Sequence, residues 1–439
     1  MAPFPQPICP SRRSPHYVLL LLLLALLLSS CNVHHRLVLA EAPPSPEWSA
    51  LLAWKSSLRR HGPLLDSWTS SSNATHPAAP CSTWYGVTCS QWGGQGAGGR
   101  RLVVVTAIRL HSRSKSRSDD EPGEASVGAG LVGTLEALDF AALPWLMHLN
   151  LRGNVLYGAI PPSIGTLSKL ASLDLSLNQL SGELPPSLAN LSRLAELDLS
   201  FNHITGELFP GFFGNGSSML VKLRLRHNNI TGKIPSEVAH LKRLHLLDLG
   251  ENQIKGGIPQ EMGHLEALRR LSLQNNNLTG PIPASIGSLT KLKALDLSTN
   301  QLSKDLPLSL ANLSLLVELD LSNNFQLTGE LHPQFFTNWT RLVTFTIQWN
   351  QITGRIPAEV RYSRSLVTLD IGANNLTGVV PTSLGSLSSL EKASVARNKL
   401  YGPLPPSLGN LTSLKIFYAD NNYITGRIPL EMGKLANLV

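Results

Sequence analysis

The chain has 439 residues, of which 42% are hydrophobic and only 6% aromatic, and its formal net charge is +8. So few aromatic residues in a leucine-rich chain of this length indicate one extended repeat array rather than several compact domains. A positive charge of this size could suggest that the chain binds nucleic acid. A secreted protein would not meet nucleic acid, so acidic peptides or wall polysaccharides are the better candidate partners. A basic surface that is merely solvated is the simpler alternative.

Residues 1–40 have the pattern of a secretory signal peptide. Arg12 and Arg13 precede an apolar run at residues 18–28, and small residues that suit cleavage follow at Ala40 and Ala42. The run is shorter than the roughly 20 residues of a membrane-spanning helix, and no later stretch approaches that length. We therefore expect a mature chain without a membrane span, in the apoplast or at the plasma membrane.

Residues 46–100 are expected to form an N-terminal cap. Leu51, Leu52, Trp54 and Leu58 fit one face of a helix. The chain also has four cysteines, of which Cys9 and Cys31 would leave with the signal peptide, whereas Cys81 and Cys89 remain and are close enough to bridge across a turn. Because the first coil of a repeat array needs a cover, we expect this segment to have a purely structural role.

Residues 101–145 are predicted to form a first, capping repeat. Residues 101–110 read as its strand and residues 130–135 as its return segment. Between them, residues 111–128 mix Arg113, Lys115 and Arg117 with serines and then carboxylates, a composition that cannot bury a core. We interpret this insert as a disordered, solvated loop, with a docking element as the alternative.

Residues 146–439 repeat one unit. Each unit has an asparagine at the same position, and the asparagines recur at steps of 24 residues, with two steps of 26: Asn154, Asn178, Asn202, Asn228, Asn252, Asn276, Asn300, Asn324, Asn350, Asn374, Asn398 and Asn422. A fixed period in this range indicates a solenoid, whose coils bury a core only by stacking. In one unit, Leu173 and Leu175 are predicted to face the core from a short strand, while Asp174 and Ser176 face outward.

The recurring asparagine is predicted to be buried, where its amide must find hydrogen-bond partners. We expect Asn178 to bond backbone groups of its own bend and of the next coil. Gly182 and Pro185 then end the strand segment, because glycine allows backbone angles closed to other residues and proline lacks an N–H donor. The last unit reaches Val439 incomplete, which predicts a fragment or a truncated form of a longer protein.

The segments Leu-Thr-Gly-Pro-Ile-Pro at 278–283 and Ile-Thr-Gly-Arg-Ile-Pro at 352–357 resemble the plant-type leucine-rich repeat. The resemblance covers about residues 46–439, including the cap, and points to the ectodomains of plant leucine-rich-repeat receptor-like kinases. It implies an α/β repeat fold: a right-handed leucine-rich-repeat solenoid with a parallel β-sheet on the concave face. A second short strand in each coil and a superhelical twist are also implied.

The same resemblance implies an extracellular recognition module. A peptide or protein ligand would lie on the concave face and recruit a coreceptor of the same repeat family, in signalling for growth, reproduction or immunity. The chain has no kinase motifs, so no enzyme activity, cofactor or metal site is expected in it, and a serine/threonine kinase would lie beyond Val439. Two alternatives stay open: a secreted inhibitor of microbial wall-degrading enzymes and a kinase-less receptor-like protein.

Binding residues are expected where the outward strand positions depart from their Asp, Ser or Gly background. Three groups do so: Lys222, Arg224, Arg226 and His227; Arg269, Arg270 and Gln274; and Thr344, Thr346, Gln348 and Trp349. Arg224 and Arg226 could grip one carboxylate, and the resemblance implies that such a pair holds the free carboxyl end of a peptide hormone. An ordinary solvated strand is the alternative. Trp349 is either a binding anchor or packed against its neighbouring coil.

Nine Asn-x-Ser/Thr sequons are candidates for N-glycosylation: Asn73, Asn190, Asn215, Asn229, Asn277, Asn312, Asn338, Asn375 and Asn410. None lies between the strand leucines, so glycans would leave the concave sheet bare. The two 26-residue steps carry aromatic pairs, Phe212–Phe213 and Phe335–Phe336, which are expected to pack on the convex side.

Overall fold

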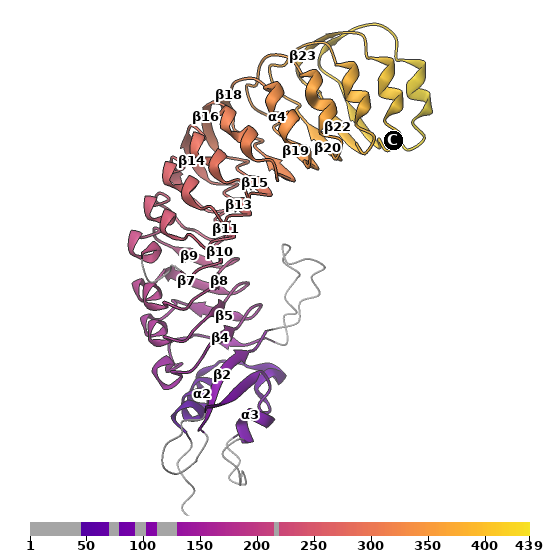
Figure 1. The fold of residues 1–439 in the computed structure, drawn as a ribbon. Helices are drawn as coiled ribbons and strands as arrows, with labels where there is room; N and C mark the ends of the chain where they lie inside the picture. The colour runs from indigo at the N-terminus through magenta and orange to yellow at the C-terminus, as the bar shows by residue number, and fades with distance from the viewer. Residues whose placement is uncertain (1–44, 70–78, 93–101, 112–129, 215–218) are drawn as a thin grey trace, which may run out of the picture. The chain divides into compact units, whose positions relative to one another are not determined.

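The computed structural model describes residues 45–69, 79–92, 102–111, 130–214 and 219–439 (Figure 1). Ser45–Val439 form one compact unit. The expected signal peptide, the insert after His111 and the sequons at Asn73 and Asn215 lie outside the described residues.

The cap consists of helix α2 (Pro46–Ser57), the 3-10 turn η1 (Gly62–Leu65), helix α3 (Ala79–Thr83) and strand β1 (Val87–Trp92). On α2, Leu51 and Trp54 are fully buried, as the helical pattern predicts, whereas Leu52 is only half-buried. The indole N–H of Trp54 donates to the Thr134 carbonyl at 2.9 Å. Helix α2 is therefore anchored to the first coil by both apolar packing and a hydrogen bond.

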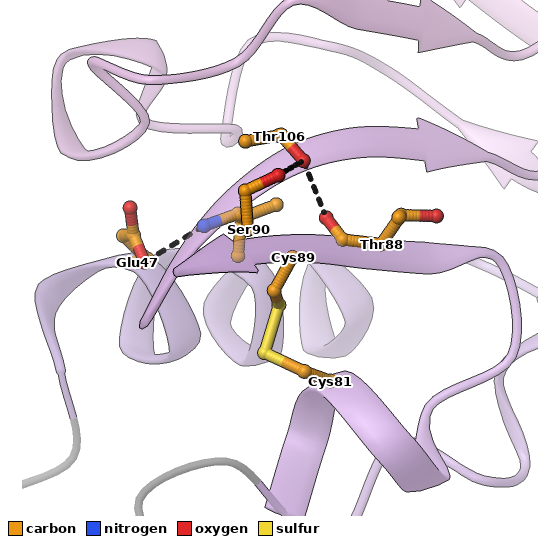
Figure 2. Close-up of a disulfide and its surroundings, with 7 residues drawn as sticks. Glu47, Cys81, Thr88, Cys89, Ser90 and Thr106 are labelled. Atoms are coloured by element: carbon orange, nitrogen blue, oxygen red, sulfur yellow. Dashed lines mark hydrogen bonds between the residues drawn. A yellow bond between two sulfur atoms is a disulfide. The ribbon is translucent and has the colours of Figure 1, made fainter. Parts of the chain in front are cut away.

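A disulfide joins α3 to β1 (Figure 2). It links Cys81 to Cys89, which confirms the expected pair. Strand β1 pairs antiparallel with β2 (Leu102–Arg109), so the cap supplies the first strand of the main sheet. Close to this pairing, the Glu47 carboxylate accepts the backbone N–H of Val105 at 3.3 Å. Burial raises the pKa of Glu47, although this hydrogen bond opposes the shift.

Within the described residues the main sheet has fourteen strands, and its order follows the chain. After β2 the strands run parallel: β4 (His148–Asn150), β6 (Ser172–Asp174), β8 (Glu196–Asp198), β10 (Lys222–Arg224), β11 (Leu246–Asp248), β13 (Arg270–Ser272), β15 (Ala294–Asp296), β17 (Glu318–Asp320), β19 (Thr344–Thr346), β20 (Thr368–Asp370), β22 (Lys392–Ser394) and β24 (Ile416–Tyr418). Leu173 stands in register with Leu149 and Leu197 on either side. Since successive side chains point to opposite faces of a strand, these leucines form a buried column and their neighbours face outward.

Most described coils then pass through a second short strand, as the resemblance implies, whereas the coils of β10 and β19 have only isolated bridges at Thr231 and Thr353. These strands form three small parallel sheets: β3 (Val132–Gly133), β5 (Val155–Gly158), β7 (Gln179–Glu183) and β9 (His203–Thr205); β12 (Lys255–Gly256), β14 (Asn277–Gly280), β16 (Gln301–Asp305) and β18 (Gln326–Thr328); and β21 (Thr377–Gly378), β23 (Lys399–Gly402) and β25 (Tyr423–Ile424). At Gly182 the chain needs glycine, because its φ is 77°.

A 3-10 turn completes each coil on the convex side, opposite the main sheet (Figure 1). The turns are η2 (Phe140–Ala142), η3 (Pro162–Thr166), η4 (Pro186–Asn190), η5 (Pro210–Phe213), η7 (Ser236–His240), η8 (Gln260–His264), η9 (Ala284–Ser288), η10 (Leu308–Asn312), η11 (Ala358–Tyr362), η12 (Thr382–Ser386), η13 (Pro406–Asn410) and η14 (Leu430–Lys434), with helix α4 (Pro333–Asn338) in one longer coil. The phenylalanine pairs lie in η5 and α4 and are buried, as expected. The arrangement is the predicted solenoid, with its parallel sheet on the concave face.

The buried asparagines form the predicted ladder, with one correction. Asn178 donates from Nδ2 to the carbonyls of Leu175 in its own bend and Leu151 in the preceding coil, both at 3.0 Å. Its Oδ1 accepts the N–H of Leu156, also in the preceding coil, at 3.0 Å. The side chain therefore bonds the coil before it, not the next coil as expected. Only its backbone N–H reaches forward, to the Phe201 carbonyl at 3.2 Å.

The residue before each ladder asparagine adopts a left-handed backbone. From Leu177 to Asn421 its φ lies between 49° and 58°. This conformation is uncommon for bulky residues, so the stacked coils impose it: Trp349, for example, donates its N–H to the Gly372 carbonyl of the next coil at 3.2 Å. We refer to these residues as the bend column: Leu177, Phe201, His227, Glu251, Asn275, Thr299, Asn323, Trp349, Ala373, Arg397 and Asn421.

Candidate ligand-binding face

The outward positions of the main sheet have a structural background. In the coil of Asn178, Asp174 accepts the backbone N–H of Ser176 at 3.0 Å and its hydroxyl at 2.6 Å. Ser176 is consequently buried rather than facing outward as predicted, because it turns back to this carboxylate. The bond to the backbone N–H two residues on recurs at Asp198, Asp248, Asp296, Asp320 and Asp370. These carboxylates fix the ends of their strands.

Strand β10 departs from this background, because Lys222 and Arg224 occupy its outward positions and Arg226 follows two residues after its end. The ammonium of Lys222 lies 2.8 Å from Glu196, and Nη1 of Arg224 lies 3.6 Å from Asp198. Both carboxylates belong to the preceding coil. The Lys222 and Arg224 side chains remain 41% and 31% exposed, so β10 presents accessible cations to the concave side.

Arg226 and His227 share one carboxylate of the following coil. Nε of Arg226 lies 2.9 Å from Oε1 of Glu251, and Nδ1 of His227 lies 2.7 Å from Oε2. Burial alone would raise the pKa of Glu251, but the hydrogen bonds from His227 and Arg226 outweigh it and lower that pKa. The His227 ring also stacks on Phe201, with 5.0 Å between centroids. We refer to Phe201, Lys222, Arg224, Arg226, His227 and Glu251 as the concave cluster.

Asp248 on β11 lies beside the concave cluster. Burial raises the pKa of Asp248 to about 6, although the backbone N–H of Gly250 and the charges of Arg226, Arg270 and Arg224 oppose the shift. The carboxyl group therefore changes its charge at mildly acidic pH. The electrostatics of the face around β10 depend on pH in the same range.

The structure brings all four candidates of the first group together, but not as two arginines on one carboxylate. Arg224 faces Asp198 of the preceding coil, whereas Arg226 faces Glu251 of the following coil. A ligand carboxylate would have to exchange with one of these partners. Exchange at Arg224 is the easier one, since 3.6 Å is beyond hydrogen-bond distance for that pair.

The second group is not a single cluster. Arg269 is exposed at the start of its strand, while Gln274 lies at the other end and folds over Gly250. The Gln274 Oε1 is buried and has no hydrogen-bond partner among the described residues. The Arg270 side chain extends past the small Ala294 of the next strand, and its Nη1 lies 3.6 Å from Oε2 of Glu318. Only Gln274 and Arg270 of this group face the concave side.

The third group centres on Trp349, which belongs to the bend column and is 43% exposed. The guanidinium of Arg397, two coils further on, lies 5.5 Å from the centre of its ring. The tryptophan is thus partly covered by its own chain and partly available. Thr344, Thr346 and Gln348 lie beside it on the same strand and bend, half-buried.

Sequence reasoning missed Phe201, Glu251 and Arg397. All three are in the bend column, and each contacts a candidate 24 to 48 residues away: His227 lies 5.0 Å from Phe201 and 2.7 Å from Glu251. The signal that could have found them is their position immediately before a ladder asparagine.

Comparison with protein families explains the repeat. Residues 44–90 match the leucine-rich repeat N-terminal domain, and residues 218–278 match a leucine-rich repeat family. Further single repeats match at residues 169–191, 193–215, 291–313 and 365–387. These segments of the chain are leucine-rich repeats with their N-terminal domain.

Plant receptors are among the proteins that this chain resembles. A probable leucine-rich repeat receptor-like protein kinase of Arabidopsis thaliana is 36% identical over 139 residues, which are 32% of this chain and 9% of the relative. The crystal structure of PEPR1–AtPEP1 superposes with a TM-score of 0.73 at 29% identity, over 89% of this chain and 54% of that one. The plant peptide hormone receptor RGFR1 in complex with RGF2 gives a TM-score of 0.63 at 30% identity, over 70% and 56%. The matched region is thus a small part of the curated relative and just over half of each solved structure.

Metal sites and membrane-spanning helices are both absent from the described residues. Among them, no three His, Cys, Asp or Glu side chains are grouped to hold a metal ion. Nor does any helix of the described part have the length and apolar character to cross a membrane. Four described sequons end a convex turn or helix, at Asn190, Asn312, Asn338 and Asn410, and three directly follow a ladder asparagine, at Asn229, Asn277 and Asn375. Their glycosylation stays a prediction.

Proposed function

We propose that this chain is the ligand-binding ectodomain of a plant cell-surface receptor, and that it recognises a peptide along its concave face. The observation that carries the proposal is the concave cluster, where Arg224 and Arg226 replace the structural Asp and Ser of other coils beside Lys222 and the stacked Phe201–His227 pair. The similarity to RGFR1, a plant peptide hormone receptor solved with RGF2, supports the same kind of ligand.

The spacing of the candidate contacts suits an extended peptide. Trp349 lies five coils after His227 in the bend column. Neighbouring strands are about 4.8 Å apart, so the two side chains are separated by roughly 24 Å, the length of about seven extended residues. We infer that Lys222 and Arg224 bind a carboxylate of the ligand and that Trp349 packs against an apolar residue near its other end.

Within this proposal the protein is extracellular. The bound ligand recruits a coreceptor of the same repeat family, and a kinase elsewhere in the whole protein reports binding in growth, reproduction or immunity. These steps rest on the similarity to receptor kinases and not on any contact described above.

Hydroxyl-radical footprinting tests the position of the ligand. The secreted chain is first incubated with a library of short synthetic peptides, each made with a free and with an amidated carboxyl end. For a peptide that binds, oxidation of His227 and Trp349 should fall, whereas Tyr85 in the cap, which is 49% exposed, should be oxidised as before. Protection confined to the convex turns, or no peptide binder at all, would overturn the proposal.

A further inference from the structure

A second charged surface lies where each convex turn leads into its strand of the main sheet. In three successive coils this segment carries exposed cations: Lys242 and Arg243, then Arg269, then Lys291 and Lys293. The segments 241–245, 265–269 and 289–293 are fully described and contain one carboxylate, Glu266. We refer to the five cations as the basic edge.

Backbone hydrogen bonds hold these segments in register. The N–H of Arg269 donates to the His245 carbonyl, and the N–H of Lys293 donates to the Arg269 carbonyl, both at 2.8 Å. The Lys242 ammonium donates to the His264 carbonyl of the next coil at 3.2 Å. The cations are therefore presented on a rigid ladder whose steps are about 4.8 Å, the strand spacing of a parallel sheet.

The basic edge differs from the concave cluster in its partners. Every cation of the concave cluster faces a carboxylate of its own chain, whereas none of the five cations of the basic edge forms an ion pair with a described residue. A recess of about 510 Å³ opens between the coils, lined by Gly263, His264, Glu266, Ser285, Ser288, Thr290 and Lys291. Accessible cations thus stand beside hydroxyl groups.

The glycosylation sequons spare this surface. The last residue of the convex turn is a sequon asparagine in η4 and η10, namely Asn190 and Asn312. In η7, η8 and η9, three of the four described turns between them, the same position is His240, His264 and Ser288. Glycans at the two asparagines would therefore flank the basic edge and leave it open.

We propose that the basic edge binds a linear polysaccharide with one carboxylate on each sugar unit, a polyuronate. Arg269 and Lys293 occupy equivalent positions one coil apart, and Arg243 and Lys291 occupy equivalent positions two coils apart. The cations are therefore spaced by multiples of the coil spacing, and a chain of uronic acids repeats its carboxylates over a comparable distance. Hydroxyl groups of Ser285, Ser288 and Thr290 would bond the sugar hydroxyls. An extended acidic peptide fits less well, because its successive side chains point to opposite sides. This site is separate from the concave cluster and independent of the peptide ligand.

The test measures the affinity of the full secreted chain for oligomeric polygalacturonate. The edge variant combines Arg243→Gln, Lys291→Gln and Lys293→Gln. The matched control combines Lys233→Gln, Lys255→Gln and Lys399→Gln, which removes the same charge from exposed lysines in the segments after the ladder residues Asn228, Asn252 and Asn398. Losing three exposed ion pairs should weaken binding by the edge variant on the order of tenfold at low salt, while the control stays within about twofold.

Two further probes identify the class of polyanion. Polyglutamate of matched length and vesicles of phosphatidylserine should both bind more weakly than polygalacturonate. Equal binding to either probe, or equal losses in the edge variant and the control, would overturn the proposal. Because all six substitutions are at exposed positions, equal melting temperatures are expected; if the edge variant melts lower, Lys242→Gln with Arg269→Gln replaces it and must show the same selective loss.

Discussion

At the residue scale, each ladder asparagine serves two coils. The amide of Asn252 donates to the carbonyls of Leu225 in the preceding coil and Leu249 in its own bend, at 3.0 and 3.1 Å. It also accepts the N–H of Ile230 at 3.0 Å. A buried backbone group without a hydrogen-bond partner destabilises the fold by about 1–3 kcal/mol. These hydrogen bonds of one asparagine side chain therefore prevent several such losses.

Replacing this side chain should therefore be costly. We expect Asn252→Ala to lower the free energy of unfolding by about 3–5 kcal/mol, because it strands buried groups in two coils. The adjacent Gln253→Ala, at an exposed position, should change it by less than about 0.5 kcal/mol. Urea denaturation measures both variants, and similar losses in the two would contradict the ladder account.

Asp248 gives the concave face a pH-dependent contribution to stability. Its carboxyl has an ordinary pKa of 3.8 and a pKa of about 6 in the folded chain, so the folded state binds the proton more tightly. The ionised, buried carboxylate destabilises the folded chain, and this effect is fully present above the folded-state pKa. It is relieved as pH falls from 6 towards 4, because the carboxyl group takes up a proton. Asp248→Asn should thus help stability more at pH 7.5 than at pH 4.5, by about 2 kcal/mol. The same difference at both pH values would show that this carboxyl does not titrate as described.

At the scale of elements, the convex turns pack closely through glycine. A Cβ added at Gly287 in η9 would lie 2.3 Å from the carbonyl oxygen of Ser309 in η10. At the same repeat position in η14, a Cβ on Gly433 would meet nothing within 4 Å. The turn beside Gly287 therefore leaves no room for a side chain there, although Ala189, Ala239 and Ala311 stand at the same position of η4, η7 and η10.

Gly287→Ala should force the two turns apart and destabilise the fold by about 1–3 kcal/mol, as overpacking does elsewhere. Gly433→Ala is the control and should have little effect. Thermal unfolding of the two variants distinguishes them, and a tolerated alanine at position 287 would mean that the coils can shift without cost.

The cap depends on its disulfide. Cys81→Ser with Cys89→Ser opens a short loop and should lower stability by about 2–3 kcal/mol. The loss should be local, so amide exchange should rise in β1 and β2 but not in β15. Equal rises in all three strands would mean that the cap and the coils unfold together.

Elements were easier to predict from sequence than side-chain partners. The period and the buried leucines such as Leu173 follow from local pattern, because each coil repeats the same positions. The pairing of Arg226 with Glu251 could not be predicted, since it depends on side-chain directions in two different coils. The prediction that Ser176 faces outward is wrong for a similar reason. The alternation of side chains ends with the strand at Asp174, and the Ser176 hydroxyl turns back to the Asp174 carboxylate.

At the scale of the whole molecule, the net charge is not evenly spread over the described surface. Five cationic side chains lie on the basic edge and form no ion pair with a described residue. The cationic side chains of the concave cluster each lie next to a carboxylate. The two surfaces therefore suit different ligands: a long polyanion at the edge, and on the concave face a peptide that must exchange with existing partners. The sequence alone could not separate them, because it gives the charge of each residue but not the face on which it lies.

The most direct test of the concave site is the dissociation constant of a peptide binder for the double variant Lys222→Ser with Arg224→Ser. Other coils carry serine at these positions, as at Ser172 and Ser272, so the fold should be kept. We predict an affinity loss of at least about tenfold, the worth of one charge-assisted contact, with little change in melting temperature. An unchanged dissociation constant would contradict the assignment of the concave cluster as the ligand-binding site.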